Sequence, residues 1–183
     1  VLHAAGIIQG DANELNFMVN LDTKTPWFID MDSAQFGNYP CRVFIKNYVD
    51  PLICDPKKDF PEQERPHSKD SDWYAFDTLL FQTLLMLHPL IGGKHVPPKK
   101  GTLATGKDAR IMRGISVYHP EVTIADQVQD GLAYHWKTLP DDLNHRFAEV
   151  FAHRIRGEFP RKLLEGMTWK SCSTCGTVHA RNT

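Results

Sequence analysis

Cysteine is scarce in this sequence, with four residues spread over 183 positions. They are Cys41, Cys54, Cys172 and Cys175. So small and scattered a set is too sparse for a disulfide framework, and it favours a reducing compartment such as the cytoplasm. We expect Cys41 and Cys54 to be packing residues of the interior.

Long apolar runs are missing as well. The most apolar stretch, residues 73–87, is shorter than the roughly 20 residues needed to span a bilayer, and it contains Asp77 and Gln82. Its apolar residues fall on every side of a helical wheel, which predicts a helix buried all round. The sequence therefore predicts a core helix and no membrane anchor.

Neither sign of charge is in excess. Lys and Arg total 21 against 22 Asp and Glu, which gives a formal net charge of −1. This balance argues against a general nucleic-acid or membrane-surface binder. No signal peptide precedes the first apolar residues, and the chain begins at Val1, so we expect it to be part of a longer protein.

Turn residues divide the first part of the chain into short elements. Two apolar runs, 15–21 and 27–31, flank a polar cluster that ends in Thr25-Pro26, and this pattern predicts a hairpin. Residues 33–70 carry many prolines and are expected to form a long ordered loop. A loop of that length inside a compact domain is usually functional.

Helices are expected to dominate after the hairpin. The central one is predicted over 71–87, with Ser71 or Asp72 as its N-cap and a stop at His88-Pro89. Residues 93–110 are rich in Lys, Gly and Pro and are predicted to be a loop. Further helices are predicted over the ranges 122–133, 141–155 and 160–169.

The sharpest chemical signal is an Asp and an Asn five positions apart, followed by a hairpin and another Asp. Asp11 and Asn16 follow the apolar pair Ile7-Ile8, and Asp30 lies at the far end of the predicted hairpin. Alone, such a spacing is weak, because Asp and Asn are common turn formers. In this order the layout aims one carboxylate at a hydroxyl, and an amide with a second carboxylate at a metal. Phosphoryl transfer requires that division of labour.

In these segments the chain resembles the protein-kinase-like superfamily. The segment 9–16 resembles the catalytic loop, the segment 30–51 the activation segment, and Ser71–Phe76 the start of the central buried helix. The segments Tyr39–Cys41 and Tyr48–Pro51 resemble a bacterial and phage group of kinase-like proteins associated with helix-hairpin-helix modules or tellurite resistance. That resemblance implies a virion-associated location if the protein is encoded by a phage.

The resemblance implies a fold and a set of roles. The fold would be mainly α (α+β): a kinase-like C-lobe over residues 1–170, with small hairpins around the catalytic loop. Asp11 would be the catalytic Asp, and Asn16 and Asp30 would bind Mg²⁺ that accompanies ATP. Asp72 would support the loop by accepting hydrogen bonds from its backbone. Because only ten residues precede Asp11, the N-lobe that grips ATP would lie upstream or on another chain.

Several residues depart from the kinase pattern. The usual His-Arg before the catalytic Asp is Gln9-Gly10, and the usual Lys two residues after it is Asn13. The Gly of the Asp-Phe-Gly triplet is replaced by Asp32, which is either a second metal ligand or a turn former. Two functions follow: phosphoryl transfer to protein Ser/Thr by the full-length protein, or a pseudokinase that serves as a scaffold for a partner.

A further departure concerns a buried ion pair of typical kinases, between a Glu after the activation-segment Pro and an Arg before a late Pro. Our alignment places these positions at Leu52 and Phe159, both apolar. Replacement of both partners by apolar residues can be neutral, whereas loss of one strands a buried charge at a cost of about 3–5 kcal/mol. The finding that both positions are apolar therefore supports this alignment.

Residues 171–183 contain a second candidate metal motif. Cys172 and Cys175 are separated by two residues and followed by Gly176, the spacing of half a zinc knuckle. A structural zinc site has four ligands, so the rest would have to come from His179 and from outside this segment. Unpaired surface thiols are the alternative.

Overall fold

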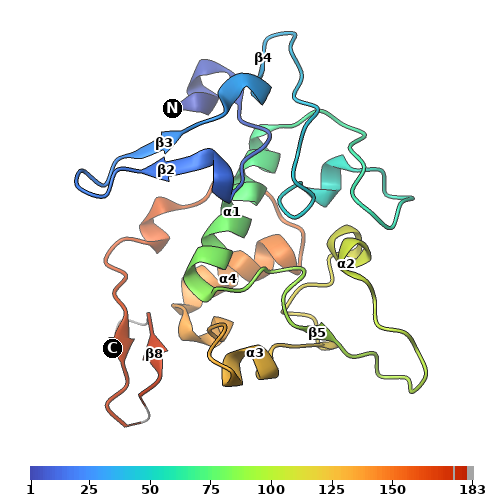
Figure 1. Ribbon diagram of the computed structural model, residues 1–183, viewed down its shortest axis with the longest axis vertical. Coiled ribbons are helices and arrows are strands. Elements are labelled where there is room, and N and C mark those ends of the chain that lie inside the picture. Colours follow the sequence, from blue (N-terminus) through green and yellow to red (C-terminus); the bar gives the residue numbers. More distant parts are fainter. Residues whose placement is uncertain (175, 181–183) are drawn as a thin grey trace.

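The computed structural model describes residues 1–174 and 176–180, and it places a central helix beneath a set of small hairpins (Figure 1). The α-helices of the described residues are α1 (Lys69–Leu85), α2 (Lys107–Arg113), α3 (Ala125–Gln129) and α4 (Asp141–Phe151). The 3₁₀ helices are η1 (Leu2–Ala5), η2 (Glu14–Asn16), η3 (Met31–Ser33), η4 (Pro51–Ile53), η5 (Trp136–Thr138) and η6 (Arg161–Leu163). Much of the remaining chain is ordered loop.

The strands are short and pair into two-stranded antiparallel units. These are β1 (Ile7–Ile8) with β4 (Gln35–Phe36), β2 (Phe17–Val19) with β3 (Pro26–Phe28), β5 (Lys94–His95) with β6 (Val122–Thr123), and β7 (Lys170–Ser171) with β8 (Val178–His179). The predicted hairpin over 15–31 is confirmed, with strands shorter than the apolar runs.

The core lies between α1 and α4. Phe81 of α1 contacts the rings of Phe147 and Phe151 of α4, with centroids 5.1 Å and 5.6 Å apart, and all three side chains are fully buried. Buried side chains surround α1 along most of its length, because α4 packs on one side of it, and Ala12, Phe17, Ile45 and Tyr48 pack on another (Figure 1). A helix packed on both sides is what the all-round apolar pattern predicts.

The predicted helix bounds need correction. The central helix begins two residues before the predicted 71–87, because Ser68 forms the N-cap in a reciprocal capping box with Ser71. It ends at Leu85, since Met86 adopts a left-handed backbone with φ 54°.

Later segments differ more. The predicted helix over 122–133 is wrong at its start, where β6 pairs with β5, and only Ala125–Gln129 is helical. The predicted helix over 160–169 is limited to the short η6, and α4 ends four residues before 155. Within the predicted loop 93–110, residues 107–110 open the helix α2, which begins after Gly106.

No helix among the described residues is both long enough and apolar enough to cross a bilayer. Cys41 and Cys54 are buried, as expected for packing residues.

Candidate functional site

Asp72 anchors the loop 9–16 to the central helix α1. Its Oδ1 accepts a hydrogen bond from the backbone N–H of Gly10 at 2.9 Å, and its Oδ2 accepts one from the N–H of Gln9 at 2.8 Å. The Oδ2 atom also lies 2.8 Å from Nε2 of His3. A carboxylate that accepts several hydrogen bonds fixes the backbone that donates them. The loop therefore begins at a fixed position on the first turn of α1.

The loop itself is braced from inside by two asparagines. The carbonyl oxygen of Asp11 accepts hydrogen bonds from Nδ2 of both Asn13 and Asn16, each at 2.8 Å. Asn13 also accepts a hydrogen bond from the N–H of Leu15 through its Oδ1, and only 1% of its surface is exposed. Asn13 is thus a buried brace of the loop.

The Asp11 carboxylate is held by two hydrogen bonds from different segments. Its Oδ1 accepts one from the N–H of Ile45 at 3.1 Å, and its Oδ2 accepts one from Nδ2 of Asn16 at 3.3 Å. The first contact joins the loop 9–16 to the segment 40–46. Among the described residues no donor reaches Oδ1 of Asn16, so this amide oxygen is available as a ligand.

The β2–β3 hairpin returns the chain to Asn16. Phe17 pairs with Phe28, and the N–H of Ile29 donates to the carbonyl of Asn16 at 3.1 Å. The next residue, Asp30, therefore lies beside Asn16. Asp30 is exposed and adopts a left-handed backbone, with φ 57° and ψ 52°. A non-glycine residue in this region is uncommon, and such residues cluster at functional sites.

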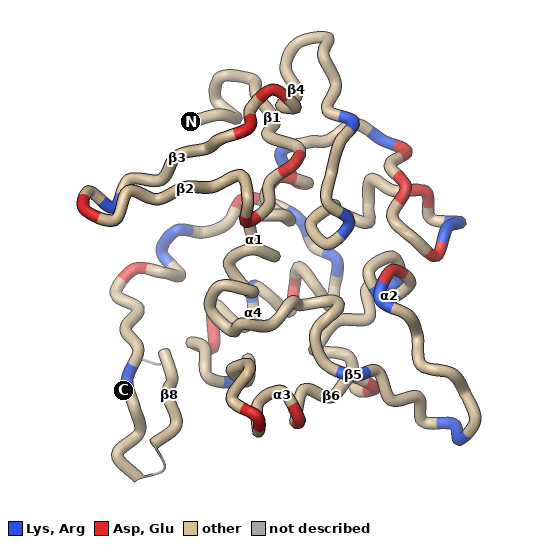
Figure 2. Tube along the Cα trace, in the orientation of Figure 1, with Lys and Arg blue, Asp and Glu red and all other residues tan. Residues whose placement is uncertain are grey.

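Negative charge accumulates at Asp30. A side-chain hydrogen bond with Asp32 raises the pKa of Asp30, and the negative charges of Asp32 and Asp11 raise it further. The described residues include no Lys or Arg in an ion pair with any of these three aspartates. Figure 2 shows acidic residues, and no basic ones, where β3 leads into β4. The arrangement lacks a cation.

The donor set fits Mg²⁺ as it is bound with a nucleotide. No group of three or more His, Cys, Asp or Glu side chains in the described part of the chain is arranged to hold a metal by itself. Mg²⁺ usually takes only one or two carboxylates from the protein and completes its shell with water and phosphate oxygens. Asp30 with the amide oxygen of Asn16 is a set of that size, and Asp32 is an exposed neighbour on η3.

The cysteine motif lies on a separate hairpin, β7–β8. The N–H of Cys172 donates to the carbonyl of Thr177, and the N–H of Gly176 donates to the carbonyl of Cys172, each at 2.9 Å. Cys175 lies outside the described residues. The zinc site therefore stays a prediction.

A buried ion pair lies beside Pro51, at other positions than the Leu52 and Phe159 that the alignment selected. Asp50 accepts hydrogen bonds from Nε and Nη2 of Arg156 at 2.9 Å and 2.8 Å, and both side chains are less than a tenth exposed. The acid precedes Pro51 instead of following it, so an alignment on the proline selected Leu52, which is partly exposed. The buried acid and base could have been found only by pairing Asp50 with a residue more than a hundred positions away.

A second buried ion pair was also missed. Nη2 of Arg146 on α4 lies 2.7 Å from Oδ2 of Asp77 on α1. Burial raises the pKa of Asp77 to about 6, against the opposing effect of Arg146. This pair joins the two helices of the core, and both side chains are less than a tenth exposed. It was missed because an apolar pattern predicts apolar side chains at buried positions.

Comparisons with known proteins find likenesses among solved structures. A scan of protein-family models finds no match, and a search of curated proteins finds no similar sequence. Among solved structures, the chain is similar to the Cydia pomonella granulovirus kinase PK-1, with 15% identity and a TM-score of 0.47. The likeness covers 82% of this chain and 45% of that kinase, so the chain spans less than half of the kinase's length.

Proposed function

We propose that the full-length protein transfers the terminal phosphoryl group of ATP to a Ser or Thr hydroxyl of a protein, with Mg²⁺. One observation carries the proposal. Asp11, Asn16 and Asp30 come together from the two ends of a hairpin, and the described chain provides none of the three with a basic partner. Clustered carboxylates without a cation are destabilised by mutual repulsion unless a ligand supplies one.

The roles of the residues follow from their contacts. Asn16, through its Oδ1, and Asp30 would hold the Mg²⁺, which neutralises charge on the phosphates when it is bound. Asp11 would orient the acceptor hydroxyl, because Ile45 and Asn16 fix its carboxylate. The hydroxyl oxygen forms a bond to the terminal phosphorus as the bond to the bridging oxygen breaks, and the hydroxyl proton passes to Asp11.

The proposal requires a further layer over the hairpin. Met18, Val19, Trp27 and Phe28 of β2 and β3 are between 43% and 61% exposed, although all are large and apolar. An apolar patch of this kind marks an interaction site. We propose that an N-lobe, supplied upstream or by another chain, covers it and completes the ATP site. It would also provide the positive charge that the buried Asn13 cannot.

The test measures phosphate transfer by the protein with its natural upstream sequence. Asp11→Asn is expected to lower the turnover by about 10²- to 10⁴-fold, as for loss of a positioned acid–base group. Asp30→Asn is expected to abolish the Mg²⁺ dependence of ATP binding. Asp22→Asn, in the exposed turn of the same hairpin, is the matched control and should leave both unchanged. Unchanged turnover in both site variants would refute the assignment.

The alternative is a pseudokinase scaffold, favoured by the buried Asn13 and by Gln9-Gly10 in place of His-Arg. A scaffold would keep the fold without using the carboxylates. Mg-ATP would then leave the thermal unfolding midpoint of the full-length protein unchanged, whereas the kinase reading requires an upward shift that Asp30→Asn removes.

A further inference from the structure

The loop 97–105 lies between β5 and α2 and extends away from the core (Figure 1). Its two lysines lie toward its outer end (Figure 2), and Leu103 is 90% exposed. Within the described chain, one hydrogen bond joins this loop to the rest of the fold: the N–H of Thr105 donates to Nδ1 of His95 at 3.0 Å. The loop is therefore tied to the fold through a single imidazole nitrogen.

His95 uses both of its ring nitrogens as a neutral imidazole. Its side chain is only 6% exposed, and its Nε2 lies 3.0 Å from Oε2 of Glu121. An ionised carboxylate only accepts hydrogen bonds, so Nε2 carries the ring proton and Nδ1 is the bare nitrogen that accepts from Thr105. The hydrogen-bond partners thus assign the tautomer of this ring.

A second proton on His95 can enter only at Nδ1. There it faces the N–H of Thr105 across a distance of 3.0 Å, and two donors cannot share that contact. The contact with Glu121 remains and becomes stronger, because both partners then carry charge. Protonation therefore breaks the bond to the loop while the ring stays in place.

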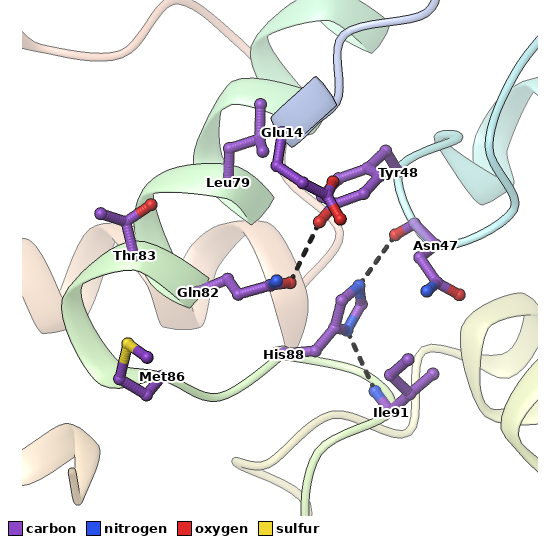
Figure 3. A pocket seen from close by; sticks show the side chains of 9 residues that line it. All are labelled: Glu14, Asn47, Tyr48, Leu79, Gln82, Thr83, Met86, His88 and Ile91. Atoms are coloured by element: carbon purple, nitrogen blue, oxygen red, sulfur yellow. Dashed lines mark hydrogen bonds between the residues drawn. The ribbon is translucent and has the colours of Figure 1, made fainter. Parts of the chain in front are cut away.

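His88 shows what the carboxylate partner adds. It is also buried, in the wall of a pocket of about 490 Å³ (Figure 3), where its Nε2 donates to the carbonyl of Asn47 and its Nδ1 accepts from the N–H of Ile91. Burial lowers the pKa of His88 to about 4, so this ring stays neutral in weakly acidic solution. His95 has the Glu121 carboxylate where His88 has a carbonyl, and a carboxylate stabilises an added proton.

We propose that His95 is a pH-sensitive switch that holds the loop 97–105 against the β5–β6 unit in neutral solution and releases it in weakly acidic solution. An imidazole is suited to this role, because it is the side chain that at ordinary basicity changes its charge between pH 5 and 8. The inference goes beyond the proposed function, because none of the residues of the switch belongs to the phosphate-transfer site.

The charged and titratable groups around His95 decide the sign of the effect. Glu121 favours the added proton, whereas His119, with its ring centroid 6.5 Å from that of His95, would oppose it if charged. Arg110 of α2 binds backbone carbonyls just before β5 and also opposes the proton. Lys94, the preceding residue of β5, is exposed. Of these groups only Glu121 forms an ion pair with the ring, so its effect is the strongest.

The test follows the Thr105 amide by NMR in the protein with its natural upstream sequence, labelled with ¹⁵N on threonine only. Its protection factor against hydrogen exchange should be about 10-fold lower at pH 5.5 than at pH 7.5, as expected for the loss of one hydrogen bond. Glu121→Gln should move the midpoint of this change to lower pH by about one unit, because the carboxylate that stabilises the proton is lost. This range lies above the pH at which His88 takes up its proton.

Two substitutions of His95 separate the switch from other effects of acid. His95→Asn places an oxygen that does not titrate near the position of Nδ1, so Thr105 should stay protected at both pH values. His95→Ala removes the acceptor, so Thr105 should be unprotected at both. His145→Asn is the matched control, because His145 forms an exposed pair with Glu149 and should leave the pH effect unchanged.

The outcomes decide the inference independently of the proposed function. Equal protection of Thr105 at pH 5.5 and pH 7.5 in the unchanged protein would overturn the switch. The same fall in His95→Asn would also overturn it, because another group would then open the loop, and a pH effect lost only in His119→Asn would assign the titration to His119. A fall that His95→Asn abolishes supports the switch whether or not the protein transfers phosphate.

Discussion

Removal of Arg156 should strand a charge in the interior. Asp50 and Arg156 have side chains only 2% and 9% exposed, and two hydrogen bonds of 2.8 Å and 2.9 Å join them. Arg156→Met leaves the Asp50 carboxylate buried with one remaining donor, the N–H of Leu52. Loss of one partner of a buried pair costs about 3–5 kcal/mol. Domains of this kind have a total stability of about 5–15 kcal/mol, so the loss is large.

The second change of the pair should recover part of this loss. Asp50→Asn removes the charge but keeps a carbonyl oxygen that can accept from Leu52. The double variant, Asp50→Asn with Arg156→Met, is therefore expected to be about 1–3 kcal/mol more stable than Arg156→Met alone, since no charge remains stranded. The free energy of unfolding is measured by urea denaturation at pH 7, with tryptophan fluorescence and circular dichroism as parallel probes.

A matched surface pair provides the control. Arg113 contacts Asp59 at 2.7 Å, but these side chains are 55% and 69% exposed. Arg113→Met should cost less than about 1 kcal/mol, because water screens the pair. If Arg156→Met cost no more than Arg113→Met, or if the double variant were no more stable than Arg156→Met, the reasoning from a stranded buried charge would be refuted.

Two further predictions concern His88 and Gly10. Burial lowers the pKa of His88 to about 4 in the folded protein, below the value of about 6.5 in the unfolded chain. Protonation therefore favours the unfolded chain. The free energy of unfolding should be highest above pH 6.5 and should fall by up to about 3 kcal/mol as the pH is lowered toward 4. His88→Asn retains an acceptor that does not titrate, and its urea midpoint should fall less over that range; an equal fall would contradict the prediction. Gly10→Ala should destabilise by more than about 2 kcal/mol, because a Cβ there meets Sγ of Cys41 at 2.6 Å on a backbone with φ +76°. Gly6 has a similar φ, but a Cβ added there meets no atom within 4 Å, so Gly6→Ala is the control. An equal loss of unfolding free energy in the two variants would show that the contact with Cys41 costs nothing.

Much of the candidate site could be predicted from residue types and their order. The spacing of Asp11 and Asn16 and the turn residues before Pro26 select a loop followed by a hairpin, and a hairpin brings its two ends together whatever surrounds it. Asp30 therefore had to return beside Asn16. The central helix was also predictable, because apolar residues on every face have no other stable location than a core.

Contacts between distant segments could not be predicted in this way. The alignment selected Leu52 and Phe159 in place of Asp50 and Arg156, because a match at one proline does not show which neighbouring side chain is buried. The observed helix is shorter than the predicted 122–133, because Val122 and Thr123 pair with a strand almost thirty residues earlier in the chain. Local propensity is a weak guide where tertiary pairing competes with it.

The sequence by itself determined the local units of this protein: the loop that carries Asp11 and Asn16, the hairpin that returns to Asp30, and the buried helix beneath them. Their causes are turn chemistry and apolar pattern, which act between neighbours in the chain. Only the tertiary structure decided that Ile45 holds the Asp11 carboxylate, that Asp50 meets Arg156, and that Glu14 faces a pocket built with Gln82. These contacts join segments whose separation in sequence carries no information about distance, because packing around one core brings them together.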